Sequence, residues 1–193
     1  MPCPSAKITT NLLRDCDKPL VRGVQSIYYV GHLSQIASLA YNATNRLIIE
    51  GIVMKTGEKM KQYEGFGFST KPSVTFSRTD FGTTKPQTFV FAVSSNTPEI
   101  DQQIEILSGA SDLFVIYKRN GLYGEWKSMG LEVGMRIEDG GLTQSADDEA
   151  NKGAWIVTLT GSDADKAPHT VRHTTASLID TDAYLLTLAT PIV

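Results

Sequence analysis

The residues whose type and spacing most suggest metal binding or catalysis are two histidines near the C-terminal end, His169 and His173. Threonine and valine residues between them indicate an extended segment, which would place both imidazoles on one face of a strand. A zinc site needs three or four ligands, and His32, Cys3 and Cys16 lie far away in the sequence. The pair therefore indicates surface or interface histidines, and we expect no metal and no other cofactor.

The sequence gives little support for two common enzyme motifs, a phosphate-binding glycine loop and a serine nucleophile motif. The run Gly65-Phe66-Gly67-Phe68-Ser69 is similar to a phosphate-binding glycine loop, but Thr70 follows it and no helix signal comes next. A Gly-x-Ser-x-Gly nucleophile motif is absent from the sequence. The many carboxylates are typical of solvated faces on a β-rich domain. We therefore expect a protein that is not an enzyme, with a β-rich hydrolase as a remaining hypothesis.

Aromatic residues offer a third kind of chemistry, the stacking of sugars. Trp126 and Trp155 lie in neighbouring predicted strands beside polar residues, and Tyr123 is close to the first of them. Such residues on a β-sandwich can form a carbohydrate platform, so a carbohydrate-binding or adhesive module is an alternative function. Apolar neighbours two residues away favour packing in the core or at an interface instead.

The elements that would position these residues are mostly strands. Residues Phe89, Phe91 and Val93 alternate with Val90 and Ala92, which predicts a central strand covered on both faces. This strand is one of several strand-like runs that end at Gly, Asn, Thr or Pro, and their regular spacing indicates antiparallel pairing. These runs cover residues 25–31, 47–54, 60–68, 74–80 and 87–94.

The stretch from Leu113 to Thr160 predicts a meander of four strands. It begins with an apolar run at 113–117, followed by Asn120-Gly121, which favours a tight hairpin turn. The next segments are 122–129 and 131–138. In the second of them apolar residues alternate with polar residues or glycine, as in a half-buried strand. A polar, acidic loop is expected over 139–153, a strand over 155–160, and one or two further strands over 170–188.

One segment predicts a helix, over residues 97–108. Thr97 is a suitable N-cap, Pro98 fits the first turn, and Ile100, Ile104 and Leu107 recur at helical spacing. The fold class is therefore mainly β, an antiparallel β-sandwich or partly closed β-barrel with one flanking helix that covers the core.

Length and charge exclude several classes of protein. A chain of 193 residues with a net charge of −3 has room for one substantial core and lacks the basic excess of a protein that wraps nucleic acid. It contains no apolar run long enough to span a bilayer and no signal-peptide pattern, so we expect a soluble protein without a membrane partner. Residues 1–22 are expected to form an N-terminal arm, 23–168 the β domain, and 169–193 a C-terminal strand and tail of that domain.

The order of these features resembles that of long-tailed bacteriophage tail tube proteins, particularly those of prophages in Bacteroides-type bacteria. The similarity spans roughly Gly23 to Pro168. The residues that carry it are Asn96-Thr97-Pro98-Glu99 at the start of the helix, the apolar strand, Asn120-Gly121, Trp126, Gly130-Leu131-Glu132-Val133-Gly134, the polar loop, and Trp155 to Thr160 followed by Gly161.

The resemblance implies a structural subunit of the virion, made in the cytoplasm of the bacterial host. Hexameric rings would join their sheets into a continuous inner barrel and would stack into a tube, with other tail proteins as further partners. Double-stranded DNA would pass through it without specific binding. A tail-completion protein, an adaptor or a tube ring of an injection system would have the same fold and remain alternatives.

Long loops and terminal arms reach the next ring in such proteins. The resemblance therefore makes inter-ring contact candidates of Asp147, Asp148 and Glu149 in the acidic loop, and of Asn42 and Thr44 in the segment 32–46.

Overall fold

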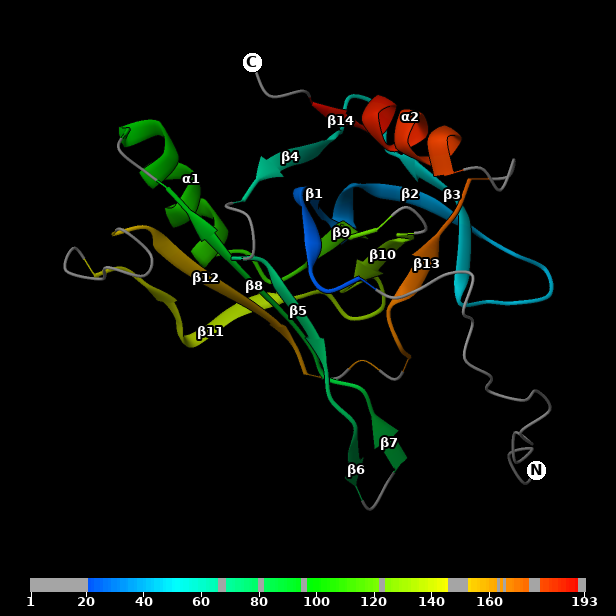
Figure 1. The fold of residues 1–193 in the computed structure, drawn as a ribbon, viewed down its shortest axis with the longest axis horizontal. Coiled ribbons are helices and arrows are strands. Elements are labelled where there is room, and N and C mark those ends of the chain that lie inside the picture. Colours follow the sequence, from blue (N-terminus) through cyan, green and yellow to red (C-terminus); the bar gives the residue numbers. More distant parts are fainter. Residues whose placement is uncertain are drawn as a thin grey trace.

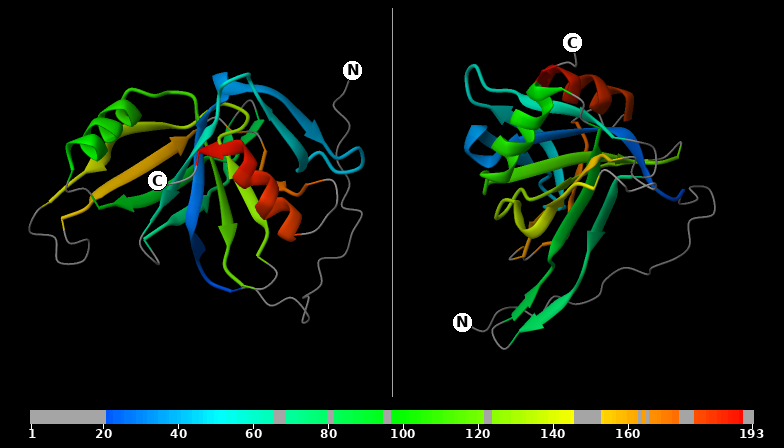
Figure 2. Two further views of the ribbon diagram at one scale, coloured as in Figure 1. Left: turned by 90° about the horizontal axis from the view of Figure 1, so that it is seen from above. Right: turned by 90° about the vertical axis from the view of Figure 1, so that its left-hand side faces the viewer.

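The computed structural model is a two-layered β-sandwich with a helix on each side (Figure 1). The structure describes residues 21–65, 69–79, 82–94, 97–121, 124–145, 153–162, 164, 166–173 and 178–190. Helix α1 (Pro98–Ser108) lies over one end of the smaller sheet, and α2 (Leu178–Leu188) lies on the larger sheet (Figure 2). The expected mainly β sandwich is therefore confirmed, and the sheets formed by the described residues do not close into a barrel.

The larger sheet has eight described strands. Their order in space is β14 (Ala189–Thr190), β4 (Met60–Glu64), β1 (Val24–His32), β9 (Leu113–Arg119), β10 (Trp126–Met129), β13 (His169–Val171), β3 (Ile48–Met54) and β2 (Ile36–Tyr41). Pairing is antiparallel except between β13 and β3 and between β14 and β4, which are parallel. A short 3-10 helix, η1 (Leu33–Gln35), separates β1 from β2.

The smaller sheet is antiparallel and has four described strands, in the order β11 (Arg136–Thr143), β12 (Trp155–Gly161), β8 (Gln87–Val93) and β5 (Lys71–Val74). β8 lies between β12 and β5, so its predicted central position is confirmed. Strands β6 (Ser77–Thr79) and β7 (Gly82–Thr84) pair only with each other, as a separate hairpin.

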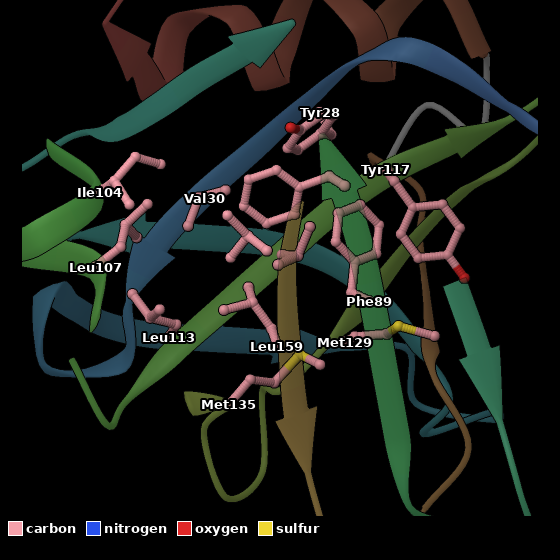
Figure 3. Close-up of a cluster of buried hydrophobic side chains, with 13 residues drawn as sticks. Tyr28, Val30, Phe89, Ile104, Leu107, Leu113, Tyr117, Met129, Met135 and Leu159 are labelled. Atoms are coloured by element: carbon pink, nitrogen blue, oxygen red, sulfur yellow. The ribbon is translucent and has the colours of Figure 1, made fainter. Parts of the chain in front are cut away.

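The first core lies between the two sheets (Figure 3). Side chains of β1, β8, β9 and β12 meet there, and α1 closes one end with Ile104 and Leu107. This is the covering role predicted for the helix, and α1 ends at Ser108, as expected. The buried residues of this first core are Tyr28, Val30, Phe89, Phe91, Ile104, Leu107, Leu113, Val115, Tyr117, Met129, Met135, Val157 and Leu159.

A second core lies on the other face of the larger sheet. Phe114 and Ile116 of β9 point into it, whereas Leu113, Val115 and Tyr117 point into the first core. The period of two along a strand divides an entirely apolar run between two cores in this way. β9 is apolar at every position from Leu113 to Tyr117 because both of its faces are buried.

Helix α2 covers this second core and corrects the prediction of strands over 170–188. Among the described residues between 169 and the helix, His169–Val171 alone forms a strand. Thr181 and Leu185 are fully buried, and Tyr184 and Leu188 are partly buried and pack against the second core. These four positions follow the helical spacing i, i+3, i+4, i+7, a pattern that the sequence contained and that the prediction of strands overlooked.

The prediction of a strand over 131–138 is wrong in its first half. Gly130 and Gly134 both have positive φ, at 80° and 75°, and the Gly134 amide donates to the Gly130 carbonyl at 2.9 Å. A side chain at Gly130 would lie 2.6 Å from the Leu113 carbonyl oxygen. The segment is therefore a tight turn that buries Leu131 and Met135, and the strand begins at Arg136.

Three other segment boundaries differ from the prediction. β11 continues to Thr143, so the expected loop over 139–153 begins later, and β2 lies inside the expected loop over 32–46. The connection after β9 contains Gly121 with a φ of 104°, as the hairpin motif predicts. It is longer than a two-residue turn, because the Arg119 amide donates to the Glu125 carbonyl.

Candidate assembly surface

The two C-terminal histidines have separate environments. His169 is buried beside the Tyr41 ring, with 5.7 Å between ring centroids, and desolvation lowers its pKa, with Lys166 acting in the same direction and Glu132 opposing. His173 packs on the ring of Tyr184 at 4.4 Å between centroids. Within the described parts of the chain, no group of three or more His, Cys, Asp or Glu side chains could hold a metal ion.

The two tryptophans belong to different sheets, so the prediction of neighbouring strands is wrong. Trp126 in β10 is 4% exposed, packs against Tyr29 and belongs to the second core. Trp155 in β12 packs at the edge of the first core, and its Nε1 donates to Asp101 Oδ1 of α1 at 3.1 Å. The pair forms no shared platform, and the packing role predicted for Trp126 is confirmed. Tyr123 lies outside the described residues.

The predicted contact residues fall into two groups. Asn42 and Thr44 lie in the exposed turn between β2 and β3, where the Asn42 side-chain oxygen accepts from the amides of Thr44 and Asn45 at 3.0 and 2.9 Å. The Asn42 side-chain nitrogen donates to Glu50 Oε1 at 2.6 Å. Asn42 therefore shapes this turn. Asp147, Asp148 and Glu149 lie outside the described residues.

The β6–β7 hairpin projects away from both sheets (Figure 1). It follows the edge strand β5 directly, and two apolar residues at its base are solvent-exposed: Val74 at 41% and Phe76 at 66%. An isolated two-stranded hairpin is marginally stable in water. A single exposed apolar side chain is ordinary on a protein surface, but the two at this base adjoin an edge strand and a hairpin that belongs to neither sheet, which makes this a candidate surface for contact with another chain.

The sequence prediction missed this hairpin by treating 74–80 as one strand. The structure ends β5 at Val74 and starts β6 at Ser77. Gly82, at a φ of 153°, opens the return strand β7 and was the available signal for a turn.

The other strand edges carry features that oppose pairing with another chain. β14 is two residues long, and β11 and β2 have register shifts where they pair with their neighbours. Short edges and bulges discourage uncontrolled strand addition. β5 pairs with β8 in regular register and contains Pro72, which has no amide hydrogen to donate. All four sheet edges thus carry a feature that opposes strand addition, and contact with a further subunit would use side chains, for which the exposed Val74 and Phe76 are the strongest candidates.

Comparison with known proteins adds no assignment. No family model, no curated protein and no solved structure matches this chain. None of the helices described is both long and apolar enough to cross a membrane.

Proposed function

We propose that this chain is a non-enzymatic structural subunit of a bacteriophage tail tube. Copies associate into hexameric rings, the rings stack, and double-stranded DNA passes along the bore without specific binding. The proposed location is the virion, with other tail proteins as further partners. The observation that carries the proposal is the projecting β6–β7 hairpin, at whose base Val74 and Phe76 are exposed beside the edge strand β5, outside both cores.

Two further properties support this function. A β-sandwich with a helix over one end of its core is the architecture that the family resemblance implies. The net charge of −3 suits a bore along which DNA moves, because an excess of Lys and Arg would bind the phosphate backbone.

Negative-stain electron microscopy of the purified protein, together with sedimentation velocity over a range of concentrations, tests the proposal. We expect rings that extend into tubes as the concentration rises. Rings that never extend would favour a completion or adaptor protein of the same fold. A particle that stays monomeric at high concentration would contradict self-assembly.

The substitution Phe76→Ser tests the hairpin itself. Phe76 is 66% exposed, so its loss should change the free energy of unfolding by no more than about 0.5 kcal/mol while weakening self-association. Ile106→Ser is the matched control, because Ile106 is 54% exposed on α1, away from the hairpin. Equal association of both variants and the unmodified protein would remove the hairpin from the assembly surface.

A further inference from the structure

A groove of about 910 Å³ lies between strand β5 of the smaller sheet and strands β1, β9 and β10 of the larger sheet. Four cationic side chains line it, and they come from four different segments of the chain: Arg22, Lys71, Arg119 and Lys127. The fold thus gathers positive charge in one concave site of a protein whose net charge is negative.

Little of this positive charge is neutralised by the residues that the structure describes. Among the residues that the structure describes, Arg22, Lys71 and Arg119 form no ion pair. Lys127 Nζ lies 3.8 Å from Glu125 Oε2, and Glu125 also pairs with Arg172. Desolvation, together with Arg119 and Arg172, lowers the pKa of Lys127 against the opposing effect of Glu125. A bound anion would relieve this repulsion.

A buried hydroxyl provides an independent indication of a ligand. Thr70 lines the same groove and is 5% exposed, and its Oγ1 has no hydrogen-bond partner among the residues that the structure describes. Buried polar atoms usually have a partner, because an unpaired one keeps the full penalty of its desolvation. This Oγ1 atom is itself inaccessible to solvent, so a carboxylate in the groove would accept its hydrogen bond after rotation of the Thr70 side chain, while facing the cations.

The groove walls indicate which kind of anion fits. Val24, Tyr117 and Pro168 place apolar surface among the cationic groups. A peptide that presents carboxylates between small apolar side chains matches both features, whereas a nucleic-acid backbone offers charge alone. The sequence contains one run of three consecutive carboxylates, Asp147-Asp148-Glu149, and alanine stands on each side of it.

We infer that the groove binds the acidic segment 146–150 of a second copy of this chain. The inference rests on the proposed self-assembly and names the contact that would drive it. The strands flanking the segment end beside α1, where Trp155 bonds to Asp101. Figure 1 shows α1 at the left and the groove's strands β5, β1 and β10 near the middle, so the ends of the flanking strands and the groove occupy different parts of the molecule. Contact between two different patches on successive copies is heterologous, the type of contact that closes rings.

The test measures binding of a synthetic peptide covering residues 142–153 by isothermal titration calorimetry. The receptor is the full chain carrying D147N, D148N and E149Q, whose own segment lacks the competing charges. We expect saturable binding that Arg119→Glu or Lys71→Glu weakens about tenfold, and that weakens as salt screens the charges. Lys55→Glu, at an exposed lysine outside the groove, should leave binding unchanged. A peptide with the same three amide substitutions should bind about tenfold more weakly.

The outcomes separate this inference from the proposed function, because peptide binding does not require rings. Rings without peptide binding would overturn the groove as the docking site and leave the tube subunit in place. Peptide binding that is sensitive to Arg119 would support the groove even if no rings form. Binding of a duplex DNA oligonucleotide in place of the peptide, with the same sensitivity to Arg119, would overturn the acidic segment as the occupant.

Discussion

At the scale of single residues, Tyr184 connects helix α2 to strand β3 of the larger sheet. Its hydroxyl accepts a hydrogen bond from the Ile52 amide at 2.7 Å and donates one to the Ile52 carbonyl at 2.6 Å. Ile52 is 1% exposed, so these backbone groups have little access to water. One side chain therefore satisfies both polar groups of a buried strand residue.

Replacing Tyr184 by Phe should lower the free energy of unfolding by about 1–3 kcal/mol, because both backbone groups of Ile52 lose their partner. Chemical denaturation followed by far-UV circular dichroism measures the change. Tyr41→Phe is the control, since Tyr41 is 40% exposed, and it should change stability by no more than about 0.5 kcal/mol. Equal effects of the two variants would show that the hydrogen bonds to Ile52 add nothing.

A second residue-scale prediction concerns Asp112. Desolvation raises the pKa of this carboxyl, but the hydrogen bonds from His32 and Ser34 and the charge of His32 outweigh it and lower the pKa from 3.8 to about 2. A lowered pKa in the folded state gives stability that is present above pH 4 and is lost as the pH falls toward 2. Asp112→Asn should therefore be less stable than the unmodified protein at pH 6.

The stability difference should narrow between about pH 4 and pH 2. A third of the Asp112 side chain is exposed, so we expect a difference of no more than about 1 kcal/mol. Urea denaturation at several pH values measures it, with Asp139→Asn on the exposed face of β11 as the control. A difference that stays constant from pH 6 to pH 2 would argue against the ion pair.

At the scale of elements, α2 packs on the face of the larger sheet that points away from the smaller sheet and covers the second core. Leu185 enters the second core, and Asp182 holds the helix to the sheet by accepting from Lys118 Nζ at 2.8 and 2.7 Å. The Trp126 indole also donates to Asp182. The helix therefore joins the second core through both apolar and charged contacts.

Adjacent leucines in α2 give a matched test of this packing. Leu185 is 0% exposed and Leu186 is 53% exposed. Leu185→Ala should destabilise the protein by about 2–5 kcal/mol through lost burial and a cavity, whereas Leu186→Ala should stay within about 0.5 kcal/mol. Thermal or chemical unfolding of both variants measures the difference, and similar values would show that α2 does not contribute to the core.

At the scale of the whole molecule, we expect folding to tolerate the loss of the acidic segment 146–150. Leu142 and Thr143 pair with Val157 and Ile156, so a deletion starting at Gly141 would remove part of β11 and of the first core. A deletion of 146–151, closed by a short Gly-Ser linker, avoids both strands. We expect a folded subunit with an unchanged unfolding midpoint that no longer assembles, because the proposed occupant of the groove is gone.

Circular dichroism and sedimentation velocity separate folding from assembly in this variant. The matched control for loop length keeps the native segment and replaces only Asp147, Asp148 and Glu149, by Asn, Asn and Gln. It should assemble as poorly as the deletion. Tubes of normal length from either variant would show that the segment takes no part in assembly.

Local patterns in the sequence determined which class of fold this chain adopts. The alternation in β8, the apolar run of β9 and the helical spacing of Ile104 and Leu107 after Pro98 in α1 depend on near neighbours, and all three predictions were confirmed. Helix α2 also had a local signal, in the spacing of Thr181, Tyr184, Leu185 and Leu188, but β-branched and small residues around it favoured the wrong prediction. The turn at 130–134 was missed because alternating apolar residues can serve a strand or a tight turn, and positive φ at two glycines decides between them.

Only the tertiary structure decided which surfaces the molecule presents. Arg22, Lys71, Arg119 and Lys127 come from four segments of the sequence, and strand pairing within each sheet together with the packing of the two sheets brings them into one groove. The exposure of Phe76 likewise depends on β6 and β7 leaving the sheet. Periodicity reports whether a residue lies on a buried face, but the position of one face relative to another is set by long-range pairing, and that pairing created the surfaces proposed for assembly.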